Sequence, residues 1–118
     1  MIQITPHIRI YLCCEPVDFR KGIDGLSGVC RRVLEKDPFS GSMFIFRNKR
    51  RTTLKMLLYD GQGFWLFMKR LSSGGFKWWP NNTTEGSITL SAPQLQLLIW
   101  NGDLSSANIG SNWRSIPN

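Results

Sequence analysis

The sequence predicts an α+β fold in which an antiparallel β-meander packs against an N-terminal amphipathic helix and a short C-terminal helix. Three observations lead to this prediction. Apolar residues recur at steps of three and four between residues 19 and 35, which is the helical period. Short turns separate successive apolar runs between residues 42 and 79, which is typical of antiparallel strands. A capping pattern at Ser91 indicates the start of a second helix.

The N-terminal part is expected to contain one strand and the longer helix. Residues 8–14 are rich in β-branched and aromatic side chains and end before Glu15-Pro16, which indicates a strand. Asp18 is expected to cap a helix over residues 19–35. The apolar stripe of this helix consists of Phe19, Ile23, Leu26, Cys30 and Val33.

The central part is expected to form the meander, with strands over residues 42–47, 52–59, 64–71 and 76–79. The Asp-Gly-Gln-Gly turn at residues 60–63 should pair Tyr59 with Phe64. Alternation then divides the hairpin into two faces. One contains Lys55, Leu57, Tyr59, Phe64, Leu66, Met68 and Arg70, and the other contains Leu54, Met56, Leu58, Trp65, Phe67 and Lys69. Both faces are apolar, so we expect one to be buried and the other to be partly covered or used for contact.

The C-terminal part is expected to contain a brief edge strand at residues 88–90 and then the short helix. Ser91 is the expected N-cap, Pro93 lies in the first turn, Gln94 completes a capping box, and the helix ends near Asn101. The chain of 118 residues has room for one domain with a hydrophobic core. We therefore expect a single domain over residues 1–102 and a flexible, Ser/Asn/Gly-rich tail over residues 103–118.

The composition argues against several classes of protein. No apolar run approaches the roughly 18 residues of a membrane span, and the N-terminus lacks the pattern of a signal peptide, so a cytoplasmic location without membrane partners is expected. Cys13, Cys14 and Cys30 have the spacing of neither a disulfide framework nor a zinc site, and we expect them to be buried thiols. His7 is the single histidine, which argues against a His-based metal or acid–base site.

The positive charge of the chain is concentrated in one stretch. The formal net charge is +7, and residues 46–79 contain eight basic residues and one acid, Asp60, whereas the rest of the chain is neutral. Such a cluster favours nucleic acid, because each neutralised phosphate releases counterions. We expect a basic rim around residues 47–55 and 69–77 to bind DNA. The candidate contacts are Arg47, Lys49, Arg50, Arg51, Lys55, Lys69, Arg70, Lys77 and Trp78.

Three tryptophans have two interpretations each, as core residues or as platforms for exposed bases. Trp65 lies inside a predicted strand and is expected to be core. Trp78 and Trp79 are adjacent, so in a strand only one of them would face inward and the other would be exposed.

Catalysis by this chain is not expected. The carboxylates that a metal-dependent nuclease would need have structural explanations: Asp18 as a helix cap, Asp24 on a solvated helix face and Asp60 in a turn. No Ser/His/Asp set and no phosphate-binding Gly-rich loop with a lysine are found. We therefore expect no catalytic residues, no metal and no cofactor, with a small metal-dependent nuclease as a minor alternative.

Four motifs, EPVDFRKGIDGL, DPFSGSMFIFRNKRR, LKMLLYDGQGFWLFMKRL and GGFKWWP, occur in this order along the chain. Over about residues 6 to 100 the sequence resembles the small TnpB-type accessory proteins (the Orf-two-like proteins) of the IS-sixty-six insertion sequences. The resemblance implies a supporting role in DNA transposition beside a separate, larger DDE-type transposase, and it transfers no catalytic residues. It adds element ends as the DNA partner of the basic residues in the matching motifs.

A second hypothesis gives the chain a different partner. The two-sided hydrophobicity of the central hairpin is also what an assembly factor would need to dock on the transposase, or on a second accessory protein, through an apolar sheet face. The sequence leaves both hypotheses open.

Overall fold

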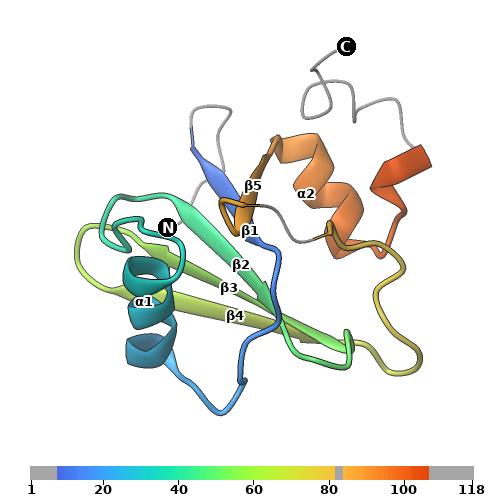
Figure 1. Cartoon of the computed structure of the whole chain (residues 1–118), viewed down its shortest axis with the longest axis horizontal. Helices are drawn as coiled ribbons and strands as arrows, with labels where there is room; N and C mark the ends of the chain where they lie inside the picture. The colour runs from blue at the N-terminus through green and yellow to red at the C-terminus, as the bar shows by residue number, and fades with distance from the viewer. Residues whose placement is uncertain (1–7, 82–83, 107–118) are drawn as a thin grey trace.

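The computed structural model describes residues 8–81 and 84–106. These residues form a five-stranded sheet with helix α1 on one face and helices α2 and η1 on the other (Figure 1). The elements are β1 (Ile10–Cys13), α1 (Ile23–Arg32), β2 (Met43–Arg47), β3 (Thr53–Tyr59), β4 (Phe64–Arg70), β5 (Ser87–Leu90), α2 (Ala92–Ile99) and the 3-10 helix η1 (Leu104–Ser106). The predicted α+β class with two helices and a sheet is thus confirmed, and the predicted topology needs a correction.

The sheet is mixed, with the strand order β4-β3-β2-β1-β5. The antiparallel meander is confirmed for β2, β3 and β4 only. β1 pairs in parallel with β2, with Ile10 opposite Met43, and β5 pairs antiparallel with β1 at the other edge of the sheet. The long connection through α1 makes the parallel pair possible, because a crossover of a dozen or more residues can return the chain to the same end of the sheet.

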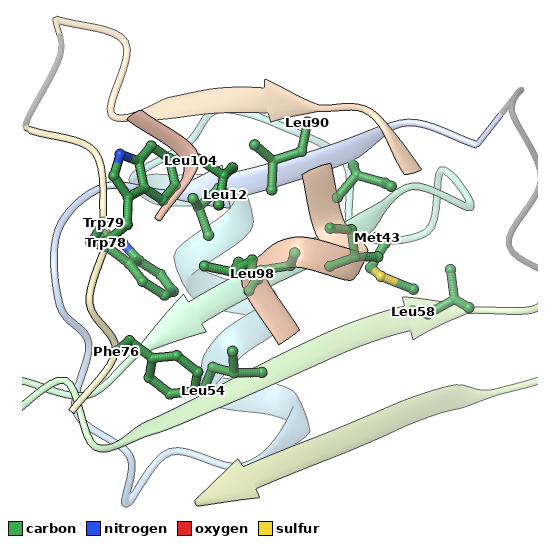
Figure 2. Packing of buried hydrophobic residues seen from close by; sticks show 13 residues of the cluster. Leu12, Met43, Leu54, Leu58, Phe76, Trp78, Trp79, Leu90, Leu98 and Leu104 are labelled. Atoms are coloured by element: carbon green, nitrogen blue, oxygen red, sulfur yellow. The ribbon is translucent and has the colours of Figure 1, made fainter. Parts of the chain in front are cut away.

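Each face of the sheet packs against a separate hydrophobic core. The core on the α2 side contains Ile10, Leu12, Met43, Ile45, Leu54, Leu58 and Leu90 from the strands, together with Leu95, Leu98 and Leu104 from the helices (Figure 2). The core on the α1 side contains Cys13, Phe44, Phe46 and Leu57, together with Leu26, Val29, Cys30 and Leu34. The central strands therefore have no solvated face, which explains why the sequence of β3 is apolar on both sides.

Helix α1 is shorter than expected at both ends. It begins at Ile23 with Gly22 as the N-cap, and the carboxylate of Asp18 accepts a hydrogen bond from the Arg20 N–H in the turn before the helix. The carbonyls of Phe19 and Lys21 accept hydrogen bonds from the Lys55 ammonium of β3, in place of helical N–H groups. Of the five residues of the predicted stripe, Leu26 and Cys30 are buried, Phe19 and Ile23 are partly buried, and Val33 is 54% exposed.

Residues 76–79 were predicted as a strand, and this prediction is wrong. The segment has no regular secondary structure, and Phe76, Trp78 and Trp79 all enter the core on the α2 side (Figure 2). The Trp79 indole N–H donates to the carbonyl of Cys13 over 2.9 Å. Because the backbone does not alternate here, two adjacent tryptophans are both buried, contrary to the expectation that one would be exposed. Trp65, expected in the core, is instead 44% exposed.

The local predictions at the hairpin and at α2 are confirmed. Tyr59 pairs with Phe64 across the Asp60 turn, and Ser91 and Gln94 form the expected capping box. Leu104 is fully buried, so the core includes a residue beyond the predicted boundary at 102. His7, and the part of the predicted tail from residue 107 onward, lie outside the described residues.

The three cysteines are buried thiols, as expected. Burial raises the pKa of Cys13 to about 11 and that of Cys30 to about 12, so neither is a thiolate near neutral pH. Within residues 8–81 and 84–106, no helix has both the length and the apolar character needed to cross a membrane.

Candidate nucleic-acid interface

The turn between β2 and β3 is held by hydrogen bonds and carries exposed cations. The Asn48 side chain accepts hydrogen bonds from the N–H groups of Thr52 and Thr53 and donates to the Thr52 hydroxyl. The Arg51 N–H donates to the Asn48 carbonyl over 3.2 Å, and Arg51 has a φ of 61°, in the left-handed region. Held in this way, the turn exposes the side chains at its tip, Lys49 and Arg50.

Two further segments bring cations to the same end of the sheet. The last residue of β4, Arg70, lies opposite Thr53 and is exposed. The Phe76 N–H donates to the Arg51 carbonyl over 2.7 Å, which brings exposed Lys77 beside the turn. A glycine at position 75 favours this approach, because a Cβ there would lie 3.0 Å from the Arg51 carbonyl oxygen, which is a tight contact. We define the basic end of the sheet as Lys49, Arg50, Arg51, Arg70 and Lys77.

Arg47, the last residue of β2, supports the turn through contacts of its guanidinium group. It is half-buried, and its guanidinium lies 5.9 Å from the centre of the Trp79 ring and donates to the carbonyl of Asn48 over 3.1 Å. Desolvation by burial, together with the nearby charge of Arg51, lowers the pKa of Arg47 from its usual value. Its contacts are with the protein itself, so it differs from the exposed cations at the tip of the turn.

Two predicted DNA contacts are occupied inside the fold. Lys55 is 8% exposed, and its ammonium donates to the carbonyls of Phe19 and Lys21 over 3.0 and 3.1 Å. The ammonium of Lys69 donates to the carbonyl of Ile99, at the end of α2, over 2.6 Å. These lysines lie on opposite faces of the sheet. Lys55 pairs with Met68 and Lys69 pairs with Leu54, and neighbouring pairs direct their side chains to opposite faces.

The predicted rim is therefore smaller than the sequence indicated. Lys55 and Lys69 bind backbone carbonyls and do not join the exposed cations. Trp78 is buried in the core on the α2 side, so its ring offers no exposed surface for stacking on a base. The structure brings together Lys49, Arg50, Arg51, Arg70 and Lys77, with Arg47 below them.

An open hollow adjoins the turn, with a volume of about 470 Å³. It lies between the turn and the loop that follows β1, which is held there by a hydrogen bond from the Val17 N–H to the Arg47 carbonyl. Its lining residues are Pro16, Val17, Asp18, Phe19, Arg20, Asn48, Lys49 and Arg50. Lys49 and Arg50 therefore line one concave surface together with the ion pair of Arg20 and Asp18, on two segments that are distant in sequence.

Arg20 is a residue of this hollow that the sequence did not indicate. Its exposed guanidinium forms an ion pair with Asp18 over 2.7 Å. The hydrogen bonds that the Arg20 side chain and backbone N–H donate to Asp18 lower the pKa of this carboxyl to about 2. Arg20 falls within the helix that was predicted over residues 19–35, whereas it lies in the loop before α1. Arg20 is recognised as a residue of the hollow from the contact between this loop and the turn, which the sequence does not show.

The candidate carboxylates occupy structural positions. Asp60 is a turn residue, as predicted: its carboxylate accepts hydrogen bonds from the N–H groups of Gln62 and Gly63 and from the indole of Trp65. Asp24 lies in the first turn of α1 and is exposed. In the part of the chain that the structure describes, no three or more His, Cys, Asp or Glu side chains are grouped as a metal site.

Comparison with known proteins gives matches over almost all of the described chain. A family model described as "IS66 Orf2 like protein" matches residues 8–108. The uncharacterized protein y4jC of Sinorhizobium fredii is 36% identical over 99 residues, which are 84% of this chain and 83% of that protein. The uncharacterized protein y4hO of the same organism is 33% identical over 99 residues, 84% of each chain. No solved structure matches.

Proposed function

The chain belongs to the IS66 Orf2-like family, and from this premise we propose that it is a non-catalytic accessory protein of DNA transposition that binds DNA through the basic end of the sheet. The family supports the accessory role in transposition. The observation that supports DNA binding is the gathering of Lys49, Arg50, Arg51, Arg70 and Lys77 at one end of the sheet, four of them exposed.

The arrangement suits a phosphate backbone better than a single small anion. The cations come from the turn, from the end of β4 and from the segment after it, so they extend over a surface. The hollow beside the turn adds a concave wall lined by Lys49, Arg50 and the ion pair of Arg20 with Asp18. Arginine guanidinium groups bind phosphate oxygens in a bidentate manner, and each contact releases counterions from DNA. In this proposal the hollow takes the sugar-phosphate backbone of the element ends.

A salt titration of DNA binding tests this proposal. The triple variant Lys49→Gln, Arg50→Gln and Arg51→Gln should lose affinity by about 10²- to 10³-fold at roughly 0.1 M salt, and its slope of log K against log salt should fall by about 2 to 3. Random DNA and element-end DNA should be affected alike, because phosphate contacts do not read sequence.

A matched control separates local contacts from net charge. The variant Arg9→Gln, Arg31→Gln and Arg32→Gln also removes three exposed positive charges, none of them at the basic end of the sheet. It should retain the wild-type salt slope. Equal losses in both triple variants, or wild-type binding in the first, would argue against an interface at this end.

The second candidate function is an assembly factor that docks on the transposase. Both faces of β3 are buried, so the exposed apolar surface of the hairpin lies on β4, where Trp65, Phe67 and Met68 are 44%, 36% and 64% exposed. In a pull-down with the transposase, this function predicts binding that survives the Lys49/Arg50/Arg51 triple variant and is lost with Phe67→Ala in a folded protein.

The non-catalytic part of the proposal is tested by incubating the purified protein with DNA and Mg²⁺ or Mn²⁺. Cleavage of the DNA that disappears with Asp60→Asn would contradict it.

A further inference from the structure

Within residues 8–81 and 84–106, β4 is an edge strand with one unpaired side. Among these residues it pairs with β3 alone, at one end of the strand order, and all seven of its residues take part in that pairing. The other side of β4 leaves backbone N–H and C=O groups that another strand could bind. Two hydrogen bonds at the ends of the hairpin identify the residues to which these groups belong.

The two hydrogen bonds fix the alternation of the hairpin. The Asp60 N–H donates to the Gly63 carbonyl, and the Leu71 N–H donates to the Thr52 carbonyl. Between these hydrogen-bonded pairs, every second pair is of the same kind. Trp65, Phe67 and Lys69 therefore direct their backbone groups toward β3. Phe64, Leu66, Met68 and Arg70 direct theirs toward the free side.

Apolar side chains flank the free side on both faces of the sheet. Trp65 and Phe67 stack on the α2 side with their ring centres 6.0 Å apart, and both are substantially exposed. Met68, on the α1 side, is 64% exposed. A strand that covers this edge needs apolar side chains on both of its own faces, and β4 itself has that pattern.

The charges of β4 are complementary to those of a second β4 that runs in the opposite direction. The carboxylate of Asp60 lies at one end of the strand, bound to the Trp65 indole over 2.7 Å, and Lys69 and Arg70 lie at the other end. An antiparallel pair brings each acidic end to the basic end of the other copy. A parallel pair would instead bring Arg70 against Arg70, at a cost in repulsion.

We propose that the chain forms a homodimer in which β4 pairs antiparallel with β4 of a second copy, about a two-fold axis at Phe67. In this register Leu66 lies opposite Met68 and Phe64 opposite Arg70, and all four of these residues have outward backbone groups. Phe67 lies opposite Phe67, in a pair without hydrogen bonds, where side chains are closest. The two five-stranded sheets become one, and the two basic ends lie far apart. The dimer does not depend on DNA binding by either copy.

Opposite charges at residue 67 test the two-fold axis directly. Analytical ultracentrifugation of the full chain should show a dimer for the wild type and at least about tenfold weaker dimers for Phe67→Glu and Phe67→Lys separately, because each variant sets like charges against each other. A 1:1 mixture of the two variants should dimerise again. This recovery also shows that both variants are folded.

Three results would overturn the proposal. One is a wild-type chain that stays monomeric at its highest soluble concentration, including a monomer whose β4 is instead captured by the transposase. Another is a dimer that neither charge variant weakens. The third is a pair of folded variants whose mixture stays monomeric, which would exclude the two-fold axis at Phe67.

A cross-linking measurement covers the case in which a charged variant does not fold. Under a mild thiol oxidant, Phe67→Cys should form a covalent dimer, because Cα atoms in a pair without hydrogen bonds are about 4.5 Å apart. Met68→Cys, at a more exposed position, should not cross-link to itself, since residue 68 would lie roughly 8 Å from residue 68 of the second copy. Equal cross-linking of the two variants, or none in Phe67→Cys, contradicts the register.

Discussion

Lys55 and Lys49 lie six positions apart and carry the same charge, yet their surroundings are opposite. Lys49 is exposed at the tip of the β2–β3 turn, whereas Lys55 is buried in β3 and donates to two carbonyls of the loop before α1. Lys69 resembles Lys55, because it donates to the last turn of α2. A cluster of positive charge in a sequence thus combines two populations, one that holds the fold together and one that faces solvent.

The chemical difference between these populations is the availability of backbone carbonyls. Lys55 projects toward the α1 layer, where the carbonyls of Phe19 and Lys21 are not used by a helix. A buried ammonium group is tolerated when such partners satisfy it. Lys49 contributes only its backbone carbonyl to a hydrogen bond from Arg47. Stability measurements should therefore separate the two lysines clearly.

Replacement of Lys55 gives the largest expected effect. Lys55→Met should lower the free energy of unfolding by about 3 kcal/mol, because two charge-assisted hydrogen bonds are lost and two carbonyls lose their partner. Urea denaturation followed by tryptophan fluorescence measures the change. The matched variant Lys49→Met should stay within about 0.5 kcal/mol of the wild type. Similar values for the two variants would mean that the contacts of Lys55 do not stabilise the fold.

Asn48→Ala should have the next largest effect. The Asn48 side chain makes three hydrogen bonds that hold the turn, and we expect their loss to cost about 2 kcal/mol. Urea denaturation measures this loss. If the basic end binds DNA, titration of the folded variant should also show weaker binding, with the salt slope unchanged because no charge is removed. A variant as stable as the wild type would show that the turn is held by its backbone alone.

Lys69→Met tests the other internal lysine, with a smaller expected effect. Its ammonium binds a carbonyl at the C-terminal end of α2, where a positive charge is favourable. The side chain is only half-buried, so we expect a loss of about 1 kcal/mol in denaturant unfolding. A loss as large as that of Lys55→Met would indicate that Lys69 determines how α2 packs on the sheet.

The smallest expected effect concerns the single acid of the basic stretch and its dependence on pH. The N–H of Gln62, the Trp65 indole and the N–H of Gly63 lower the pKa of Asp60 from 3.8 to about 2. Because this pKa is lower in the folded chain, the unfolded chain binds more protons in that range. The stabilising contribution is therefore present above pH 3.8 and lost as the pH falls through about 2. The difference in stability between wild type and Asp60→Asn should shrink over this range; a constant difference would contradict this role of the carboxylate.

Features fixed by neighbouring residues could be predicted from the sequence, and features fixed by distant contacts could not. The pairing of Tyr59 with Phe64 follows from a four-residue turn, and the start of α2 follows from Ser91 and Gln94. The parallel pairing of β1 with β2 depends on how the crossover through α1 returns, which no local pattern encodes. The predicted antiparallel meander therefore did not include this parallel pair.

The candidate interface shows the same limit. The turn with Lys49 and Arg50 was recognisable as a basic segment, because its charges are consecutive. The Lys55 ammonium, in contrast, donates to carbonyls that lie 34 and 36 residues away in the sequence. The contribution of Arg20 depends on the contact between Val17 and Arg47. Charge patterns predict the sign of a surface, while the fold decides which charges reach it.

The place of β1 in the sheet has a consequence for synthesis on the ribosome. β1 is made first, yet it stands between β2 and β5, and its pairing with β5 brings Ile10 opposite Leu90. While the chain is being made, β2, β3 and β4 can assemble and β1 can join them, with one side of β1 unpaired. That side stays open until Leu90 has left the exit tunnel. We therefore expect chaperones to bind and protect nascent chains until β5 has been made.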